Sequence, residues 1–224
     1  MLTLQGLQQQ LSPCMNAPAW VLGLSGGLDS MVLLDALVQL REQQAIPPLS
    51  AIHVHHGLSA EADAWVAFCE RECARRDVPL QVDRVQLTPG ASIEGAARDA
   101  RYQAFAARLP PEVVLLLAHH RDDQLETLLF RMLRGTGLRG LAGMPATRTL
   151  ADGCLLRPLL RWNRVELEQW ARKHGLHWIE DPANQDPRFA RTALRHQLLP
   201  LLRQSWPQVE QSLLRLARHA GEAN

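Results

Sequence analysis

The sequence predicts an α/β fold, a doubly wound parallel sheet followed by a small helical segment. Short apolar runs alternate with stretches of helical periodicity along most of the chain. The run at 113–118 is apolar throughout, as in a strand that helices cover on both faces. This alternation favours a parallel sheet whose ligands bind beyond the carboxyl ends of the strands.

The first strand is expected at 19–22 and the first helix at 31–40, with a Ser-Gly-Gly turn between them. Two glycines let the backbone approach an anion, and the free amides of a helix start favour negative charge. Ser25 and Ser30 add hydroxyl donors. The stretch from Ser25 to Ser30, with Gly26, Gly27 and Leu28, is therefore predicted to be a phosphate-binding loop.

Asp29 stands where a Walker A loop would continue to its lysine, and this loop has no such lysine. A carboxylate facing phosphates needs a divalent cation or donors between them, so Asp29 is a candidate Mg²⁺ ligand. The alternative is an ordinary turn in which Asp29 caps the helix.

The next elements are a strand at 49–55, a helix at 60–76, a strand at 80–85 and a helix after Ser92 that ends near Leu109. With the strand at 113–118, they place 25–30, 53–56 and 119–123 along one rim of the sheet. Three further segments are expected: a helix from Asp122 to Arg134, a glycine-rich loop at 138–144 beside the site, and a hairpin around 152–153.

A helix at 164–174, an irregular connector at 178–193 and helices at 192–203 and 207–219 complete the prediction. We divide the chain into a nucleotide-binding domain (1–145), a continuation with a connector (146–203) and a C-terminal helix (204–224). Trp206 is expected to be a core residue.

Composition limits the class of protein. With 224 residues, of which 46% are hydrophobic, the chain can bury a sizeable core. No run approaches the ~18 apolar residues of a membrane helix, and the N-terminus lacks the features of a signal peptide. We therefore expect a cytoplasmic protein with no membrane partner. The four cysteines form no zinc or redox pair and are expected to be reduced.

The net charge of +1 hides an asymmetry. Acidic residues exceed basic ones in 1–120, and the reverse holds in 121–203. All of the 24 basic residues except Lys173 are arginine, which favours bidentate phosphate contacts. The basic segment is the candidate surface for a polyanion.

Seven segments form a recognisable set of motifs: 25–30 (SGGLDS), 53–58 (HVHHGL), 97–102 (ARDARY), 120–127 (HRDDQLET), 134–141 (RGTGLRGL), 157–160 (RPLL) and 178–184 (WIEDPAN). Together they resemble the bacterial tRNA(Ile)-lysidine synthetases, which belong to the PP-loop group of ATP pyrophosphatases. The resemblance covers about residues 17–203 and implies a Rossmann-like topology of the adenine nucleotide alpha hydrolase type. Two departures are Ala183, where the family usually has Ser or Thr, and Arg191-Thr192 in place of an Arg-Asn pair.

The resemblance implies an enzyme that uses ATP and Mg²⁺ to join free L-lysine to C2 of the wobble cytidine, position 34, of tRNA(Ile) with a CAU anticodon. Lysidine would form through an adenylated cytidine, with release of pyrophosphate and AMP. Many relatives carry further C-terminal domains that grip tRNA, and we expect them to be absent from this chain. A homodimer is an open option.

The resemblance also assigns roles to residues. Catalysis falls to Asp29, His120, Asp123, Arg98 and Arg101; nucleotide binding to Ser25, Gly26, Gly27, Leu28, Asp29, Ser30 and His53; substrate or tRNA binding to Asp122, Glu126, Arg134, Arg139, Arg191 and Arg195; and metal binding to Asp29. Lysine binding and activation are expected of Asp122, Asp123 or Glu126.

Each role has a structural alternative. His120 and Asp123 could be a helix-capping pair, His53 an ordinary strand residue, and Arg191 and Arg195 part of a solvated helix face. Two other functions also remain open. One is a PP-loop tRNA thiolation enzyme, which would want a suitably spaced cysteine pair. The other is a non-catalytic nucleotide- or tRNA-binding module.

Overall fold

A six-stranded sheet organises the chain. The computed structural model describes residues 1–57, 59–85, 93–181 and 190–223. The strand order is β3-β2-β1-β4-β6-β5, and all neighbours are parallel except β5 and β6. The strands are β1 (Trp20–Gly23), β2 (Leu49–His55), β3 (Leu80–Arg84), β4 (Val114–Leu116), β5 (Thr147–Leu150) and β6 (Gly153–Leu156). The predicted fold class is confirmed.

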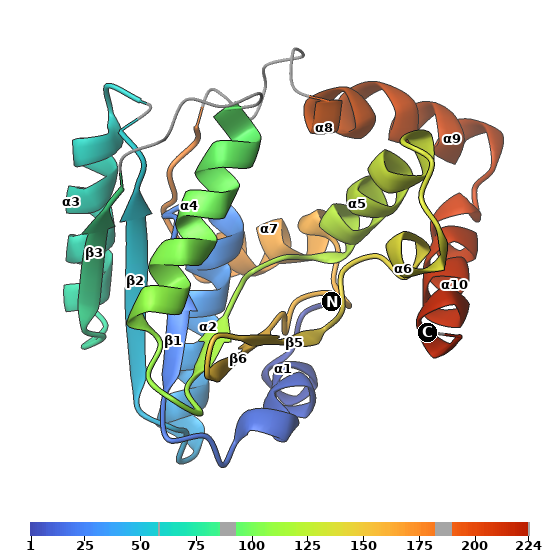
Figure 1. The fold of residues 1–224 in the computed structure, drawn as a ribbon. Coiled ribbons are helices and arrows are strands. Elements are labelled where there is room, and N and C mark those ends of the chain that lie inside the picture. Colours follow the sequence, from blue (N-terminus) through green and yellow to red (C-terminus); the bar gives the residue numbers. More distant parts are fainter. Residues whose placement is uncertain (58, 86–92, 182–189, 224) are drawn as a thin grey trace.

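Helices pack on both faces of this sheet (Figure 1). They are α1 (Leu4–Leu11), α2 (Leu28–Gln43), α3 (Ala62–Ala74), α4 (Ile93–Arg108), α5 (Arg121–Leu133), α6 (Leu138–Leu141), α7 (Arg164–Lys173), α8 (Ala190–Ala193), α9 (Leu199–Ser205) and α10 (Val209–Glu222). A π-helical turn, Leu194–Leu198, joins α8 to α9. In the described part of the chain, no helix is long and apolar enough to cross a membrane.

Alternating strand residues supply two cores. Trp20 and Leu22 of β1 face a core shared with α1, α2, α3 and α7, whereas Val21 faces the core beneath α4. The same alternation separates Leu115 of β4 from its neighbours Val114 and Leu116. Burial on both faces explains why these strands read as continuous apolar runs. Cys69 and Cys73 are buried free thiols, as predicted.

A third core lies beyond the sheet, at the C-terminal end of the chain. Leu125 and Leu129 of α5 pack against Leu194 and Leu199, and α10 adds Leu213. Helix α5 begins directly beyond β4. The C-terminal helices are therefore anchored on the helix that starts at the carboxyl edge of the sheet (Figure 1).

The structure corrects three expectations and adds one helix, near the N-terminus, that was not predicted. The segment 138–144 is not wholly a loop, because α6 begins at Leu138, and Trp206 is 63% exposed rather than buried. Helix α1 had no counterpart in the prediction. The helix expected from Asp122 begins at Arg121. The 152–153 hairpin is confirmed. Ser92 and residues 182–189 of the 178–193 connector lie outside the described residues.

Candidate functional site

The predicted phosphate loop joins β1 to the start of α2. Gly26 has a φ of +83°, and a Cβ there would lie 2.5 Å from Cδ1 of Ile179 and 3.1 Å from Sγ of Cys69. Only glycine suits both the backbone conformation and this close packing. Ile179 also donates its backbone N–H to the Gly26 carbonyl at 2.9 Å. Packing by Ile179 and Cys69 and the hydrogen bond from Ile179 thus fix the loop conformation without a ligand.

The loop itself contains two hydroxyl groups and leads into the N-terminus of α2. Ser25 Oγ and Ser30 Oγ are 3.1 Å apart, and Ser25 Oγ accepts the Gly27 N–H at 3.3 Å. Gly27 is the N-cap of α2 and offers no side chain, so the first amides of a 16-residue helix have no side-chain cap. Uncapped amides at a helix start suit an anion such as a phosphate.

Asp29 and His120 meet where α2 and α5 begin. His120 Nε2 lies 3.6 Å from Asp29 Oδ2 and 3.6 Å from Asp123 Oδ2, and the His120 side chain is fully buried. Asp29 Oδ1 is a buried oxygen without a hydrogen-bond partner. Burial raises the pKa of Asp29, Asp123 raises it further, and His120 opposes the shift. An unpartnered buried carboxylate oxygen of this kind suits a cation ligand.

His120 and Asp123 form a reciprocal cap at the start of α5. Asp123 donates its N–H to His120 Nδ1 at 3.4 Å, and Asp123 Oδ2 accepts the His120 N–H at 2.9 Å. His120 and Asp123 are therefore a helix-capping pair. Because Nδ1 accepts, the ring carries its proton on Nε2 in the neutral tautomer, aimed at Asp29 and Asp123. The same contacts that cap the helix thus orient a donor toward the loop.

The carboxylates of α5 are already paired with arginines. Glu126, 1% exposed, accepts two hydrogen bonds from Arg195, at 2.6 and 3.1 Å. Arg195 also lies 3.5 Å from Asp123. Asp122 accepts from Arg203 at 3.0 Å and from the backbone N–H of Arg164 at 2.7 Å. Three later segments therefore converge on one acidic cluster, Asp29, Asp122, Asp123 and Glu126.

Burial and partners set opposite pKa directions within this acidic cluster. Burial works against ionisation of Asp123, but His120, His119 and the His120 backbone N–H hold its pKa below the usual value. Burial raises the pKa of Glu126 despite the guanidinium of Arg195. These partners thus hold Asp123 in its ionised form.

The histidines at the strand ends differ in environment. His53 is buried, and its Nδ1 lies 2.8 Å from the Leu24 carbonyl oxygen, which places it beneath the loop rather than in it. Burial lowers the pKa of His53, and it lowers the pKa of His56 and His119 to about 4. His56 and His119 each keep a buried Nδ1 without a partner. They are neutral rings near the rim.

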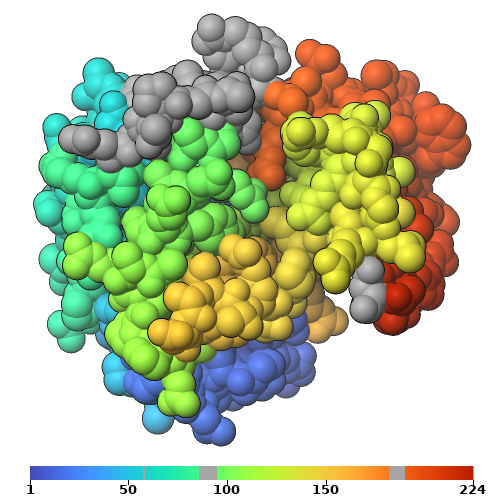
Figure 2. Space-filling model, viewed as in Figure 1, coloured from blue at the N-terminus to red at the C-terminus, as the bar shows by residue number. Residues whose placement is uncertain are grey.

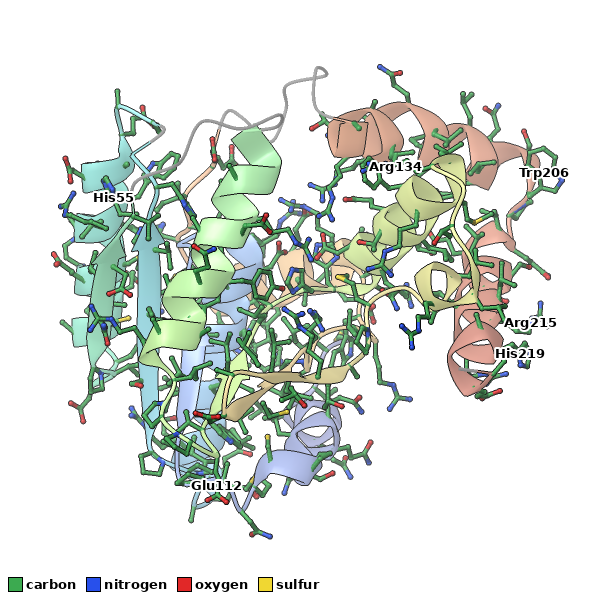
Figure 3. All side chains as sticks on the ribbon, viewed as in Figure 1. His55, Glu112, Arg134, Trp206, Arg215 and His219 are labelled. Atoms are coloured by element: carbon green, nitrogen blue, oxygen red, sulfur yellow. The ribbon has the colours of Figure 1, made fainter. Side chains whose placement is uncertain are left out.

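The remaining predicted arginines are spread more widely. Arg101 donates to His56 at 3.4 Å, and Arg98 lies over the Tyr102 ring. Arg134 and Arg139 are exposed, and Figure 3 shows Arg134 at the carboxyl end of α5, the end remote from its cap. The structure therefore brings Asp29, His120, Asp123, Glu126 and Arg195 together and leaves Arg134 and Arg139 apart.

Three residues of the site escaped the sequence analysis. Arg164 lies 3.8 Å from Asp29, Arg203 pairs with Asp122, and Ile179 packs on Gly26. The Asn-x-x-Glu capping box that begins α7 marks the position of Arg164 but not its partner. Contacts over such sequence separations leave no local pattern.

Taken together, the fold and the loop define an α/β domain with a Ser-Gly-Gly turn between β1 and α2, at the carboxyl edge of the sheet. The chain belongs to the PP-loop domain family, which matches residues 3–202.

Similar proteins agree with this family. The chain is 59% identical over 217 residues to a tRNA(Ile)-lysidine synthase of Pseudomonas fluorescens (strain Pf0-1), covering 97% of this chain and 49% of that protein. It is 51% identical over 203 residues to a protein of the same name from Escherichia coli O157:H7, covering 90% of this chain and 47% of the relative. The chain thus spans about half the length of these curated relatives.

Two solved structures share the fold. The U34-tRNA thiolase NcsA from Methanococcus maripaludis aligns with a TM-score of 0.74 at 16% identity, over 96% of this chain and 77% of its own. An NH3-dependent NAD synthetase from Campylobacter jejuni subsp. jejuni NCTC 11168 aligns with a TM-score of 0.50 at 15% identity, over 100% of this chain and 95% of its own.

Proposed function

We propose that the chain carries the catalytic centre of a tRNA(Ile)-lysidine synthase. ATP would adenylate the C2 oxygen of cytidine 34 in a CAU anticodon and release pyrophosphate, after which the side-chain amine of lysine attacks C2 and expels AMP. The observation that carries the proposal is the position of the acidic cluster, where α2 and α5 begin, directly beside the phosphate loop. The 51–59% identity to proteins of that name supports it.

The loop and Asp29 fit ATP and Mg²⁺. Ser25, Ser30 and the free amides of α2 offer donors to phosphates, and Asp29 Oδ1 lacks a partner. Within the described ranges no three His, Cys, Asp or Glu residues are arranged to hold a metal ion. Mg²⁺ commonly binds through one or two carboxylates together with substrate phosphates, so Asp29 alone is sufficient on the protein side. The ion would supply positive charge at the phosphates.

Asp123 is the proposed partner of the lysine ammonium. Glu126 is held by two hydrogen bonds from Arg195, and Asp122 by Arg203 and Arg164, whereas Asp123 lies at a longer distance, 3.5 Å, from Arg195. Asp123 is the member of this acidic cluster with a lowered pKa, and it lies beside His120 Nε2. Its negative charge would bind the ammonium, and His120 would orient the reacting groups.

The thiolation alternative is disfavoured by the cysteines. Cys14, Cys69 and Cys73 are buried, and burial raises the pKa of Cys69 to about 12 and those of Cys14 and Cys73 to about 11. A thiol with so high a pKa is a poor nucleophile at neutral pH.

The test is the release of AMP and pyrophosphate with lysine and tRNA each present or omitted. We expect AMP release only with both. Asp29→Asn should abolish it, whereas Asp152→Asn, an exposed residue of the β5–β6 turn, should not. Release that ignores lysine would contradict the proposal, and nucleotide binding without turnover would identify a non-catalytic module. A cytoplasmic location and a homodimer stay predictions.

A further inference from the structure

Tyr102, the one tyrosine of the chain, contacts three arginines from three separate segments. The Cζ atoms of Arg98, from α4, and of Arg148, from β5, lie 5.4 and 4.6 Å from the centre of its ring. Arg157, just after β6, donates from Nη2 to Tyr102 Oη at 3.4 Å. These four residues are called the Tyr102 cluster below. Cation–π attraction offsets only part of the electrostatic repulsion between the three guanidinium groups.

The cluster lacks a counter-charge among the described residues. None of its three arginines forms an ion pair with a described carboxylate, whereas Arg164, Arg195 and Arg203 all do. Arg157 is 3% exposed. Its Nη1 donates to the Pro145 carbonyl at 2.6 Å, and its buried Nε has no partner. A buried guanidinium with an idle donor and no anion nearby is costly, so the cluster suits an anionic ligand.

The cluster borders the candidate site. Burial lowers the pKa of His119, Asp123 opposes the shift, and Arg157, Arg98 and Arg191 add to it. His119 therefore lies within electrostatic reach of both the acidic cluster and the Tyr102 cluster. Figure 2 shows a hollow on this face between α4, in green, and α5–α6, in yellow, with β5–β6, in gold, along its lower side. The three elements that carry the Tyr102 cluster bound this hollow.

We propose that the Tyr102 cluster binds backbone phosphates of the RNA strand whose base enters the site at Asp29 and His120. Exposed Arg148 and half-buried Arg98 would contact the phosphates, while buried Arg157 adds positive charge behind the Tyr102 ring. The inference rests on the proposed function and names the contact that positions its substrate. Arginine favours phosphates because its fork of N–H donors matches their oxygens. Arg98 and Arg148 already lie over the Tyr102 ring, so the ring is not free to stack on a base. Phosphate rather than base is therefore the expected ligand.

The triphosphate of ATP is the other source of the same chemistry. The phosphate loop at 25–30 already offers hydroxyls and helix amides to it. Among the described residues, no hydrogen bond or ion pair joins the Tyr102 cluster to that loop. The two phosphate-binding sets are built on different elements, so RNA and ATP binding can be separated by mutation.

The first test measures the salt dependence of RNA binding. Arg148 is exposed on an edge strand, so Arg148→Gln should leave the fold intact. An anticodon hairpin RNA is titrated at several salt concentrations. Losing one phosphate contact should reduce the slope of log K against log salt by about 0.7 to 0.9. Between 50 and 200 mM salt, the affinity of the variant should thus fall about threefold less than that of the wild type.

Two variants serve as controls. Arg71→Gln removes the same charge from an exposed position on α3, which covers the opposite end of the sheet, and should leave the slope unchanged. Arg148→Lys keeps the charge and should keep the slope. An equal slope for Arg148→Gln and the wild type, or an equal loss in Arg71→Gln, would overturn the proposal. So would a failure of the wild type to bind the hairpin.

The second test uses the single tyrosine. Uniform 3-fluorotyrosine labelling gives one ¹⁹F resonance, from Tyr102. The hairpin should shift it with the same affinity that the titration gives, while ATP with Mg²⁺ should leave it in place. A shift with ATP alone would assign the cluster to the nucleotide and overturn the RNA assignment. Neither measurement needs lysine or turnover, so a lack of lysine-dependent AMP release would refute the proposed function and leave the phosphate site standing.

Discussion

Arg195→Met is expected to destabilise the fold through Glu126. The variant removes both hydrogen bonds to a carboxylate that is 1% exposed and leaves that charge buried without a partner. Breaking a buried pair in this way costs about 3–5 kcal/mol. The Arg195 side chain is 30% exposed, so water screens part of the pair, and we expect about 2–3 kcal/mol.

The pH dependence identifies the cause. Burial already raises the pKa of Glu126, and loss of Arg195 must raise it further. The folded variant then retains a proton that the unfolded chain releases, so its stability falls as pH rises above the unfolded value. The destabilisation by Arg195→Met should therefore be larger at pH 8 than at pH 5. In Glu126→Gln/Arg195→Met this difference should disappear, because position 126 no longer titrates.

Urea unfolding followed by circular dichroism at both pH values measures this effect. With a slope of about 2–3 kcal/mol per molar urea, the midpoint should fall by roughly 1 M at pH 8. A midpoint unchanged at both pH values would refute the buried-pair reasoning. If hairpin RNA binding also lost salt dependence in Arg195→Met, Arg195 would instead act on phosphates, as the sequence alone suggested.

Three further outcomes are expected. Asp29→Asn should keep the fold, judged by thermal unfolding, yet lose Mg²⁺-dependent adenylation; activity equal to that of the wild type at every Mg²⁺ concentration would contradict the assigned role. Gly26→Ala should cost about 1–3 kcal/mol in urea unfolding, because φ is +83° and Ile179 is close, whereas Gly27→Ala should cost less, and equal effects would argue against that strain. His119, with a pKa of about 4 when folded, should weaken the fold as pH falls from 6.5 toward 4; His119→Gln should show a smaller acid loss, and an identical pH profile would exclude this group.

Much of the fold could be predicted because parallel strands and amphipathic helices leave periodic patterns. β2 was predicted with its observed ends, 49–55, and the placement of 25–30, 53–56 and 119–123 along one rim followed from the strand ends alone. Helix α6 was missed since Gly137 and Gly140 indicate a loop, although the turn between them closes through Gly140 N–H to Gly137 O at 3.0 Å. Helix α6 also packs against α5 and α10, and no local sequence pattern predicts these contacts.

Less of the candidate site could be predicted. Motif residues beside the strand ends were found because they are close in sequence to an element boundary. Arg203 and Arg164 were not found, because each contacts Asp122 from a position far away in the sequence. Trp206 was wrongly predicted to be a core residue, because the prediction rested on its being a tryptophan. Its position at the C-terminal helices leaves it exposed (Figure 3).

Charge counted along the chain also differs from charge presented at the site. The basic segment 121–203 is where a polyanion surface was predicted, yet Arg164, Arg195 and Arg203 are paired with carboxylates there. Arg98 comes from the acidic first half of the chain, and Arg148 and Arg157 come from the second half. None of the three has a carboxylate partner among the described residues. Field lines from unpaired charges reach a ligand, whereas those of close ion pairs largely cancel. The attraction for RNA should therefore be centred on the α4–β5 side of the hollow between α4 and α5–α6, and an approaching strand would meet this side before its base reaches Asp29.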